Sequence, residues 1–186
     1  MSQENVEIVR QPIEVGTSTR RRLQERLFLR VPGVGIALTR AVFRMRPSSR
    51  LRQVMLRRAL RLSVEASNRG DLEAIFALAH PDHETIPPPE LVGIGFDAVY
   101  HGRDGRLRFQ QQWVAELGEF QQESEEIIDL GDRVLLHGQM KGTGLSSGAE
   151  WHSEAAYLLT VSDGRVIREQ LFRSHQQALE AVGLSE

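Results

Sequence analysis

Residues 161–184 read VSDGRVIREQLFRSHQQALEAVGL and carry the clearest fold signal in this chain of 186 residues. Ser162–Asp163–Gly164 is a turn sequence that separates two strand-like runs, 151–161 and 166–174. A short helical pattern follows at 176–182. The segment therefore predicts an antiparallel hairpin followed by a helix.

The residues before this hairpin predict the rest of an α+β fold. The elements expected there are helices at 71–79 and 105–117 and strands at 83–86, 120–129 and 133–142. Gly131–Asp132 supplies one turn, and the Gly/Ser-rich loop 142–148 supplies the next. Helices followed by an antiparallel meander are typical of α+β proteins.

The order of these elements and four segments of sequence resemble a known family. The segments are ASNRGDLEAIFALAHPD (66–82), YHGRDGRLRFQQQW (100–113), IDLGDRVLLHGQMKGTG (128–144) and the hairpin segment 161–184. They resemble the SnoaL-like group of the nuclear transport factor 2-like superfamily, over about residues 62–186. The resemblance implies a cystatin-like fold, in which a curved antiparallel sheet wraps around helices and encloses a conical cavity.

Charge divides the chain into two parts. Arg10–Arg61 holds 14 arginines and two acidic residues, a net charge of +12, whereas the remaining residues sum to −14. We therefore predict an arginine-rich helical N-terminal extension at 1–61 and a SnoaL-like domain at 62–186. The helices expected at the N-terminal end lie at 19–31, 36–46 and about 48–68.

The extension has three alternative partners. The favoured one is the acidic surface of the chain's own domain, because the two parts carry opposite charge. An anionic membrane surface is the alternative for residues 20–61, because residues 27–43 are apolar enough to lie in an interface. Nucleic acid is the least favoured partner, because the extension contains no lysine and its aromatic residues are Phe28 and Phe43.

Composition excludes several classes of protein. The chain has no cysteine, which rules out disulfides, a thiolate metal site and a cysteine nucleophile. Its first residues, MSQENVEIVR, do not have the basic and then apolar pattern of a secretory signal. From these features we expect a cytoplasmic protein.

Alternation along the hairpin predicts the face that lines the cavity. A three-residue turn would pair Tyr157 with Glu169 and Leu159 with Ile167. The residues predicted to line the pocket are Tyr157, Leu159, Ile167, Glu169 and Leu171 of the hairpin, together with Trp113 and Ile86. A slip of one residue in the register would reverse this face.

Glu169 and Tyr157 are the candidate catalytic residues. An acid in an apolar cavity must be protonated, paired or functional, and a neighbouring phenol could exchange a proton with it. The alternatives are that Glu169 pairs with Arg168, Arg173 or Lys141 at a rim and that Tyr157 is a packing residue. Both interpretations stay open.

The resemblance does not supply a reaction. The carboxylate base of related steroid isomerases corresponds most closely to Ile86, and the aspartate of related epoxide hydrolases and cyclases corresponds to Leu171. The resemblance implies a domain that binds a small apolar ligand, with a cyclase, isomerase or hydratase acting on an apolar carbonyl or polyketide-like compound as the enzymatic option. A non-catalytic dimeric binding or scaffold module is the alternative.

We expect no metal and no other cofactor. His137, His152 and Glu154 lie on neighbouring strands, but alternation places His152 and Glu154 on the face opposite Tyr157.

We also expect a homodimer, because Leu158 and Phe172 would lie on an outer sheet face that no helix covers.

Overall fold

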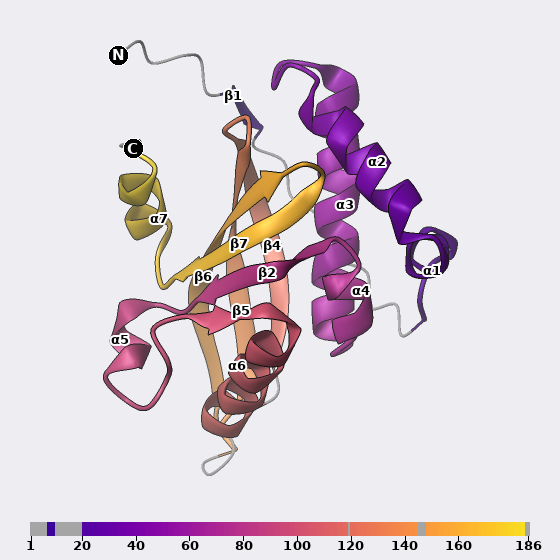
Figure 1. Cartoon of the computed structure of the whole chain (residues 1–186). Helices are drawn as coiled ribbons and strands as arrows, with labels where there is room; N and C mark the ends of the chain where they lie inside the picture. The colour runs from indigo at the N-terminus through magenta and orange to yellow at the C-terminus, as the bar shows by residue number, and fades with distance from the viewer. Residues whose placement is uncertain (1–6, 10–19, 119, 145–147, 185–186) are drawn as a thin grey trace.

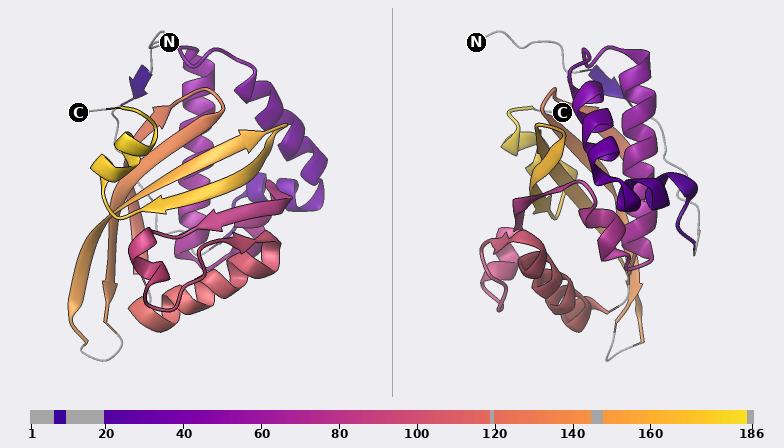
Figure 2. Two further views of the ribbon diagram at one scale, coloured as in Figure 1. Left: turned by 60° about the vertical axis from the view of Figure 1, so that its left-hand side comes forward. Right: turned by 45° about the vertical axis from the view of Figure 1, so that its right-hand side comes forward.

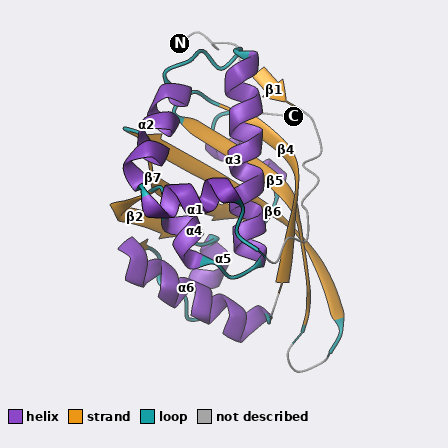
Figure 3. Ribbon diagram, turned by 90° about the vertical axis from the view of Figure 1, so that its right-hand side faces the viewer, coloured by secondary structure: helices purple, strands orange, loops and turns teal. Residues whose placement is uncertain are grey.

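The computed structural model describes residues 7–9, 20–118, 120–144 and 148–184. Thr19, where the first helix was expected to start, and part of the loop 142–148 lie outside these residues. The protein is an α+β fold in which one curved sheet separates two unequal groups of helices (Figure 1). Figure 3 shows the inner side of the sheet, with α1, α2, α3, α4 and α6 lying in front of it.

Seven strands form the sheet in the order β1-β4-β5-β6-β7-β2-β3. Their bounds are β1 Glu7–Val9, β2 Ala79–Ile86, β3 Tyr100–His101, β4 Phe120–Asp129, β5 Arg133–Thr143, β6 Glu150–Ser162 and β7 Arg165–Phe172. Strands β4 to β7 make the predicted antiparallel meander. One pair of strands departs from the antiparallel arrangement, because β2 runs parallel to β7. Strand β1, which pairs with β4, was not predicted.

Every helix except α5 lies in a segment where periodicity predicted one, although α4 is shorter than expected and Ala79 belongs to β2. Their bounds are α1 Leu23–Arg30, α2 Pro32–Phe43, α3 Arg50–Asn68, α4 Leu72–Phe76, α5 Pro89–Val92, α6 Gly102–Leu117 and α7 His175–Ala181. Helix α2 begins at Pro32, four residues earlier than expected, because proline suits the first helical position. Asp71 caps α4 and Ser174 caps α7, each by accepting a backbone N–H.

The main core fills the space between the inner sheet face and the helices. Leu56, Leu60 and Val64 of α3 share one buried cluster with Phe109 and Trp113 of α6. The boundary predicted at residue 62 falls inside α3, which runs unbroken from the arginine-rich segment into the domain. The end of the extension is therefore part of the domain's core.

A buried ion pair joins this helix to the sheet. Arg52 Nε donates to Asp129 Oδ2 at 2.6 Å and its Nη2 donates to Oδ1 at 2.7 Å, with the two residues 1% and 3% exposed. The remaining guanidinium hydrogens go to the carbonyl oxygens of Phe43, Met45 and Gly131. All five N–H donors of Arg52 are thus used, and they connect the end of α2, helix α3 and the β4–β5 turn.

Ion pairs also attach α1 and α2. Arg21 contacts Asp71 at 2.6 Å, Arg22 contacts Glu65 at 2.7 Å, and Arg40 contacts Asp163 at 2.6 Å. These contacts agree with the favoured prediction that the extension packs on acidic groups of its own chain. No helix among the described residues is both long and apolar enough to span a membrane.

Helix α7 covers the outer face of the sheet, on the side opposite α3 (Figure 2). Its Ala178 and Leu179 form a second buried cluster with Ile128 and Leu135, which also contains Leu158 and Phe172. The expectation that helices cover only the inner face was therefore wrong. Leu158 and Phe172, which motivated the predicted homodimer, are already buried within one chain.

Candidate functional site

The β6–β7 hairpin positions Glu169, and its register differs from the predicted one. Ser162 pairs with Arg165 across a two-residue turn, Asp163–Gly164, in which both residues have positive φ. This turn alone would have set Glu169 opposite Leu158 on the outer face. A bulge at Ile167 adds one residue to β7, so that Glu169 lies opposite Leu159.

The turn and the bulge thus offset each other, and Glu169 faces inward as predicted. Tyr157 lies opposite Leu171 and not opposite Glu169. Ile167 is the extra residue of the bulge, and Ile86 lies beside Gln170 on the other face of the sheet from Glu169. Neither isoleucine is among the residues that line the cavity.

A cavity of about 50 Å³ lies between α3, α6 and the inner sheet face. It brings together five predicted pocket residues: Trp113, Tyr157, Leu159, Glu169 and Leu171. Its polar lining also includes Ser63, Ser67, Arg106, Gln110 and Gln122. Several polar groups therefore converge inside a largely apolar wall, as in many small-molecule sites.

Arg106 of α6 is the partner of Glu169. Its Nε donates to Glu169 Oε2 at 3.1 Å, and its Nη1 donates to Gln110 Oε1 at 3.0 Å. The side chains of the pair are only 7% and 15% exposed, and the guanidinium lies 5.0 Å from the centre of the Phe109 ring. The pair is therefore largely buried, and Gln110 and the Phe109 ring hold the arginine in place.

Two of the three alternative partners of Glu169 are engaged elsewhere. Arg168 pairs with Glu84 at 2.6 Å, and Lys141 pairs with Glu123. The sequence did contain a signal for Arg106, because Arg106, Gln110 and Trp113 follow helical spacing on one face of α6. The sequence alone did not show which part of the protein this face of α6 contacts.

Tyr157 is buried, and its hydroxyl has a weak partner. The O–H donates to Met140 Sδ at 3.4 Å, and a thioether is a poor acceptor. Burial raises the pKa of Tyr157, and the charge of Glu169 raises it further. The phenol is therefore neutral at ordinary pH, with its hydrogen available to a better acceptor.

The indole of Trp113 offers a second donor. The residue is 5% exposed, and its Nε1–H has no hydrogen-bond partner among the described residues. A buried donor without an acceptor is costly, which makes it a candidate for contact with a bound molecule.

His83 of β2 lies beside the ion pair, and sequence reasoning did not select it. Its Nδ1 donates to the Val166 carbonyl at 3.2 Å, and its Nε2 lies 3.2 Å from the hydroxyl of Thr85, the residue that pairs with Glu169. Burial lowers the pKa of His83, although the charge of Glu169 opposes this effect. His83 is thus a neutral residue that fixes the β2–β7 junction.

A second cavity of about 170 Å³ adjoins the first, and the arginine-rich segment forms much of its wall. Both cavities are lined by Leu60, Ser63, Ile75 and Leu159. The second is mainly apolar, with Phe28 of α1 and Leu38 and Val42 of α2 among its lining residues. Helices α1 and α2 therefore help to enclose a second space that is next to the cavity of Glu169.

A family model described as the SnoaL-like domain matches residues 60–169. The chain belongs to the SnoaL-like family. SnoaL-like domains bind small-molecule ligands, and the cavities agree with that general property. No curated protein matches the chain.

Solved structures confirm the fold of this SnoaL-like domain. TerC, co-crystallised with polyporic acid, is 25% identical with a TM-score of 0.58, and the match covers 66% of this chain and 94% of TerC. An NTF2-like protein of unknown function from Burkholderia pseudomallei is 21% identical with a TM-score of 0.58, with 68% and 95% covered. A Catenulispora acidiphila protein with a ketosteroid isomerase-like fold, in complex with trimethylamine, is 17% identical with a TM-score of 0.52, with 68% and 93% covered.

Proposed function

We propose that this SnoaL-like protein binds a small carbonyl compound with a ring-sized apolar group. The observation that carries the proposal is the position of the Arg106–Glu169 pair in the wall of a small cavity with several polar groups, next to a larger apolar cavity. The carbonyl end would lie near Arg106, Trp113 and Tyr157. The apolar end would occupy the space beneath α1 and α2.

The volumes of the two cavities support a ligand with a small carbonyl end and a larger apolar end. A cavity of about 150 Å³ lined by apolar side chains is large enough to hold benzene, and the second cavity is slightly larger. The first, at about 50 Å³, has room for a functional group but not for a ring. TerC, whose structure contains polyporic acid, supports an organic ligand for this fold.

The reaction that we propose is proton transfer next to the carbonyl group. The Glu169 carboxylate would take a proton from the carbon beside the carbonyl, and the electron pair would move to the carbonyl oxygen. A hydrogen bond from Tyr157 or Trp113 would stabilise that oxygen, and the proton would return from Glu169 to carbon. The proton and the electron pair both return to the substrate, so this reaction does not require a cofactor. In this scheme Glu169 is the base, and Arg106 is the cation beside it.

A non-catalytic binding protein is the second candidate. The Tyr157 hydroxyl contacts Met140, and Glu169 already has a cationic partner, so each group also has a structural role. A scaffold of this kind would bind the same ligand without exchanging its protons.

The experiment compares phenyl ketones with alkylbenzenes of equal length. Thermal-shift assays should show a larger rise in Tm with the ketone, because only the ketone accepts hydrogen bonds from the polar cavity. Arg106→Met should abolish this preference, whereas Arg108→Met, on an exposed part of the same helix, should keep it. Equal responses to ketone and hydrocarbon would contradict the proposed orientation.

Catalysis is tested separately by NMR. In deuterated water, the protein should accelerate exchange of the hydrogens beside the carbonyl of a bound ketone. Binding without accelerated exchange would favour the second candidate.

The homodimer and a contact of residues 20–61 with an anionic membrane stay predictions. Light scattering at tens of micromolar tests the first, and co-sedimentation with anionic vesicles at physiological salt tests the second. Arg21, Arg22 and Arg40 are already paired within the chain, which makes a strong membrane contact less favourable.

A further inference from the structure

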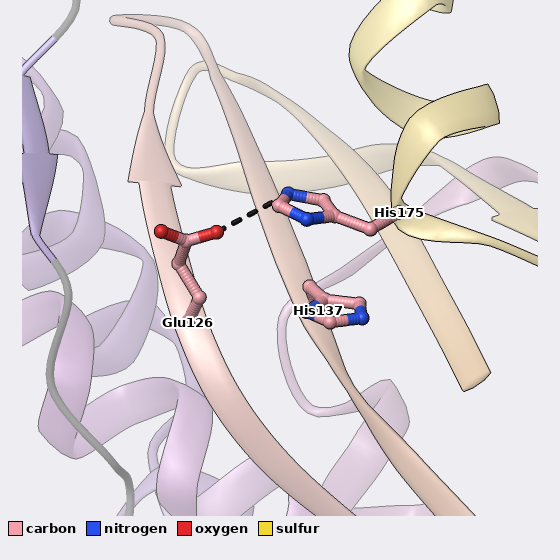
Figure 4. A group of neighbouring side chains, drawn as sticks. All are labelled: Glu126, His137 and His175. Carbon is pink, nitrogen blue, oxygen red and sulfur yellow. Dashed lines mark ion pairs between the residues drawn. The ribbon is translucent and has the colours of Figure 1, made fainter. Parts of the chain in front are cut away.

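Two histidines and a glutamate meet on the outer face of the sheet, away from the cavities. Glu126 of β4 pairs with His137 of β5, and His175 is the first residue of α7. Figure 4 shows the two imidazole rings beside the Glu126 carboxylate. Their face is opposite that of Leu136, which lines the cavity of Glu169.

The donor atoms lie close enough to share one ion. His175 Nε2 is 3.2 Å from Glu126 Oε2, and one ligand atom from each of the three residues lies within 4.8 Å of the others. Two ligands of a tetrahedral zinc ion, each about 2.1 Å from the metal, are about 3.4 Å apart. The His175–Glu126 separation already has this value, so the main adjustment falls on His137.

Binding of an ion requires the His137 ring to turn out of its stack with His175. The two rings stack with centroids 4.3 Å apart and an angle of 11° between the planes. A tilt of the His137 ring would direct one nitrogen to the point shared by the other two donors. Ala156, the cross-strand neighbour of His137, has a small side chain.

The surroundings hold the three side chains in place. The side chains of His175 and Glu126 are only 21% and 12% exposed. Ser174 caps α7, and the backbone N–H of His175 donates to Glu154 Oε2 at 3.2 Å. Rigid, partly desolvated donors on three elements lose little freedom when they bind an ion.

We propose that Glu126, His137 and His175 form a binding site for a divalent transition metal ion of the Zn²⁺ type. Two imidazoles and one carboxylate are ligands that zinc prefers, and a fourth position is left for water. The ion would connect α7 to β4 and β5 and so hold the helix on the outer face. This site is independent of the function proposed for the cavities.

Binding is tested on the full-length protein after removal of any histidine tag and treatment with a chelator. Titration with Co²⁺ should give the visible absorption of a four-coordinate ion with one equivalent bound. Zn²⁺ should displace the Co²⁺, and free Zn²⁺ at 100 times Kd should raise Tm by about 5 to 10 °C.

Variants locate the site. His137→Ala and His175→Ala should each lose the Co²⁺ spectrum and weaken Zn²⁺ binding at least about 10-fold. His101→Ala, which removes an exposed histidine elsewhere, should bind both ions like the wild type. The spectrum reports coordination directly, so it separates loss of a ligand from loss of the ion pair between His175 and Glu126. Wild-type protein without a Co²⁺ spectrum, or variants that retain it, would overturn the proposal.

Discussion

Two arginine–carboxylate pairs occupy very different surroundings in this molecule. At the junction of α2, α3 and the β4–β5 turn, Arg52 donates to both oxygens of Asp129 and to three backbone carbonyls. In the cavity, Arg106 makes one bond to Glu169 and one to Gln110.

The difference lies in what surrounds each pair. Protein groups satisfy the Arg52 guanidinium completely, which suits a purely structural role. The Arg106–Glu169 pair lines open space together with Trp113, whose indole N–H has no partner within the part of the chain that the structure describes. The Arg106–Glu169 pair can therefore contact a bound molecule, whereas the Arg52–Asp129 pair cannot. This difference between the two pairs can be tested.

The largest effect is expected at the structural pair. Arg52→Ala should lower the free energy of unfolding by about 3–5 kcal/mol, because it leaves Asp129 charged, buried and unpaired. Urea denaturation measures the loss, and Arg50→Ala, at an exposed position of the same helix, is the control. A loss below about 1 kcal/mol would show that water replaces the guanidinium.

At the cavity pair, the expected effect is on chemistry. Glu169→Gln keeps the shape of the side chain and removes the base, so proton exchange in a bound ketone should slow by at least about 100-fold. Its unfolding free energy should change less than that of Arg52→Ala. Unchanged exchange would limit Glu169 to a pairing role and make the two ion pairs alike.

Gly164 tests how firmly α2 is joined to the sheet. The residue has φ of +79°, and an added Cβ would overlap the Ile36 carbonyl oxygen of α2. Gly164→Ala should therefore cost about 1–3 kcal/mol of stability. Gly131→Ala is a matched control, because Gly131 has φ of +91° but open space around it. Equal losses in the two variants would mean that contact with α2 adds nothing.

The smallest effect concerns pH. The pKa of His83 is lowered by burial, so the unfolded chain binds a proton more readily than the folded one as pH falls through about 6.5. His83 therefore contributes a loss of stability below that pH, with Glu169, Arg106 and Glu84 as the charged groups that act on it.

Tm measured between pH 5.5 and 7.5 should rise less steeply for His83→Gln than for the wild type. His101→Gln, at an exposed histidine, should keep the wild-type slope. Identical slopes for all three proteins would contradict the assignment of a buried, neutral His83.

The meander was predictable because its turns are local. The β4 strand has the predicted bounds, Phe120–Asp129, because Gly131 and Asp132 mark the turn that follows it. The inward direction of Glu169 was also predicted, although a two-residue turn and a bulge produced it in place of a three-residue turn.

Contacts between distant segments could not be predicted. Arg106 reaches Glu169 across 63 residues, and Arg52 reaches Asp129 across 77. The helical pattern around Leu179 predicted helix α7, but it did not predict which face of the sheet this helix covers. Pairing between elements depends on how they pack in space, which periodicity along one segment does not record.

The unbroken course of α3 has a consequence for engineering. The apolar cavity is walled by Phe28, Leu38 and Val42 from the first part of the chain, whereas Arg106 and Glu169 come from the last half. The apolar wall and the charged pair therefore come from separate stretches of sequence, and α3 packs against both. Phe28, Leu38 and Val42 can therefore be varied to change the fit of a ligand, while the Arg106–Glu169 pair and the arginines that attach α1 and α2 are kept.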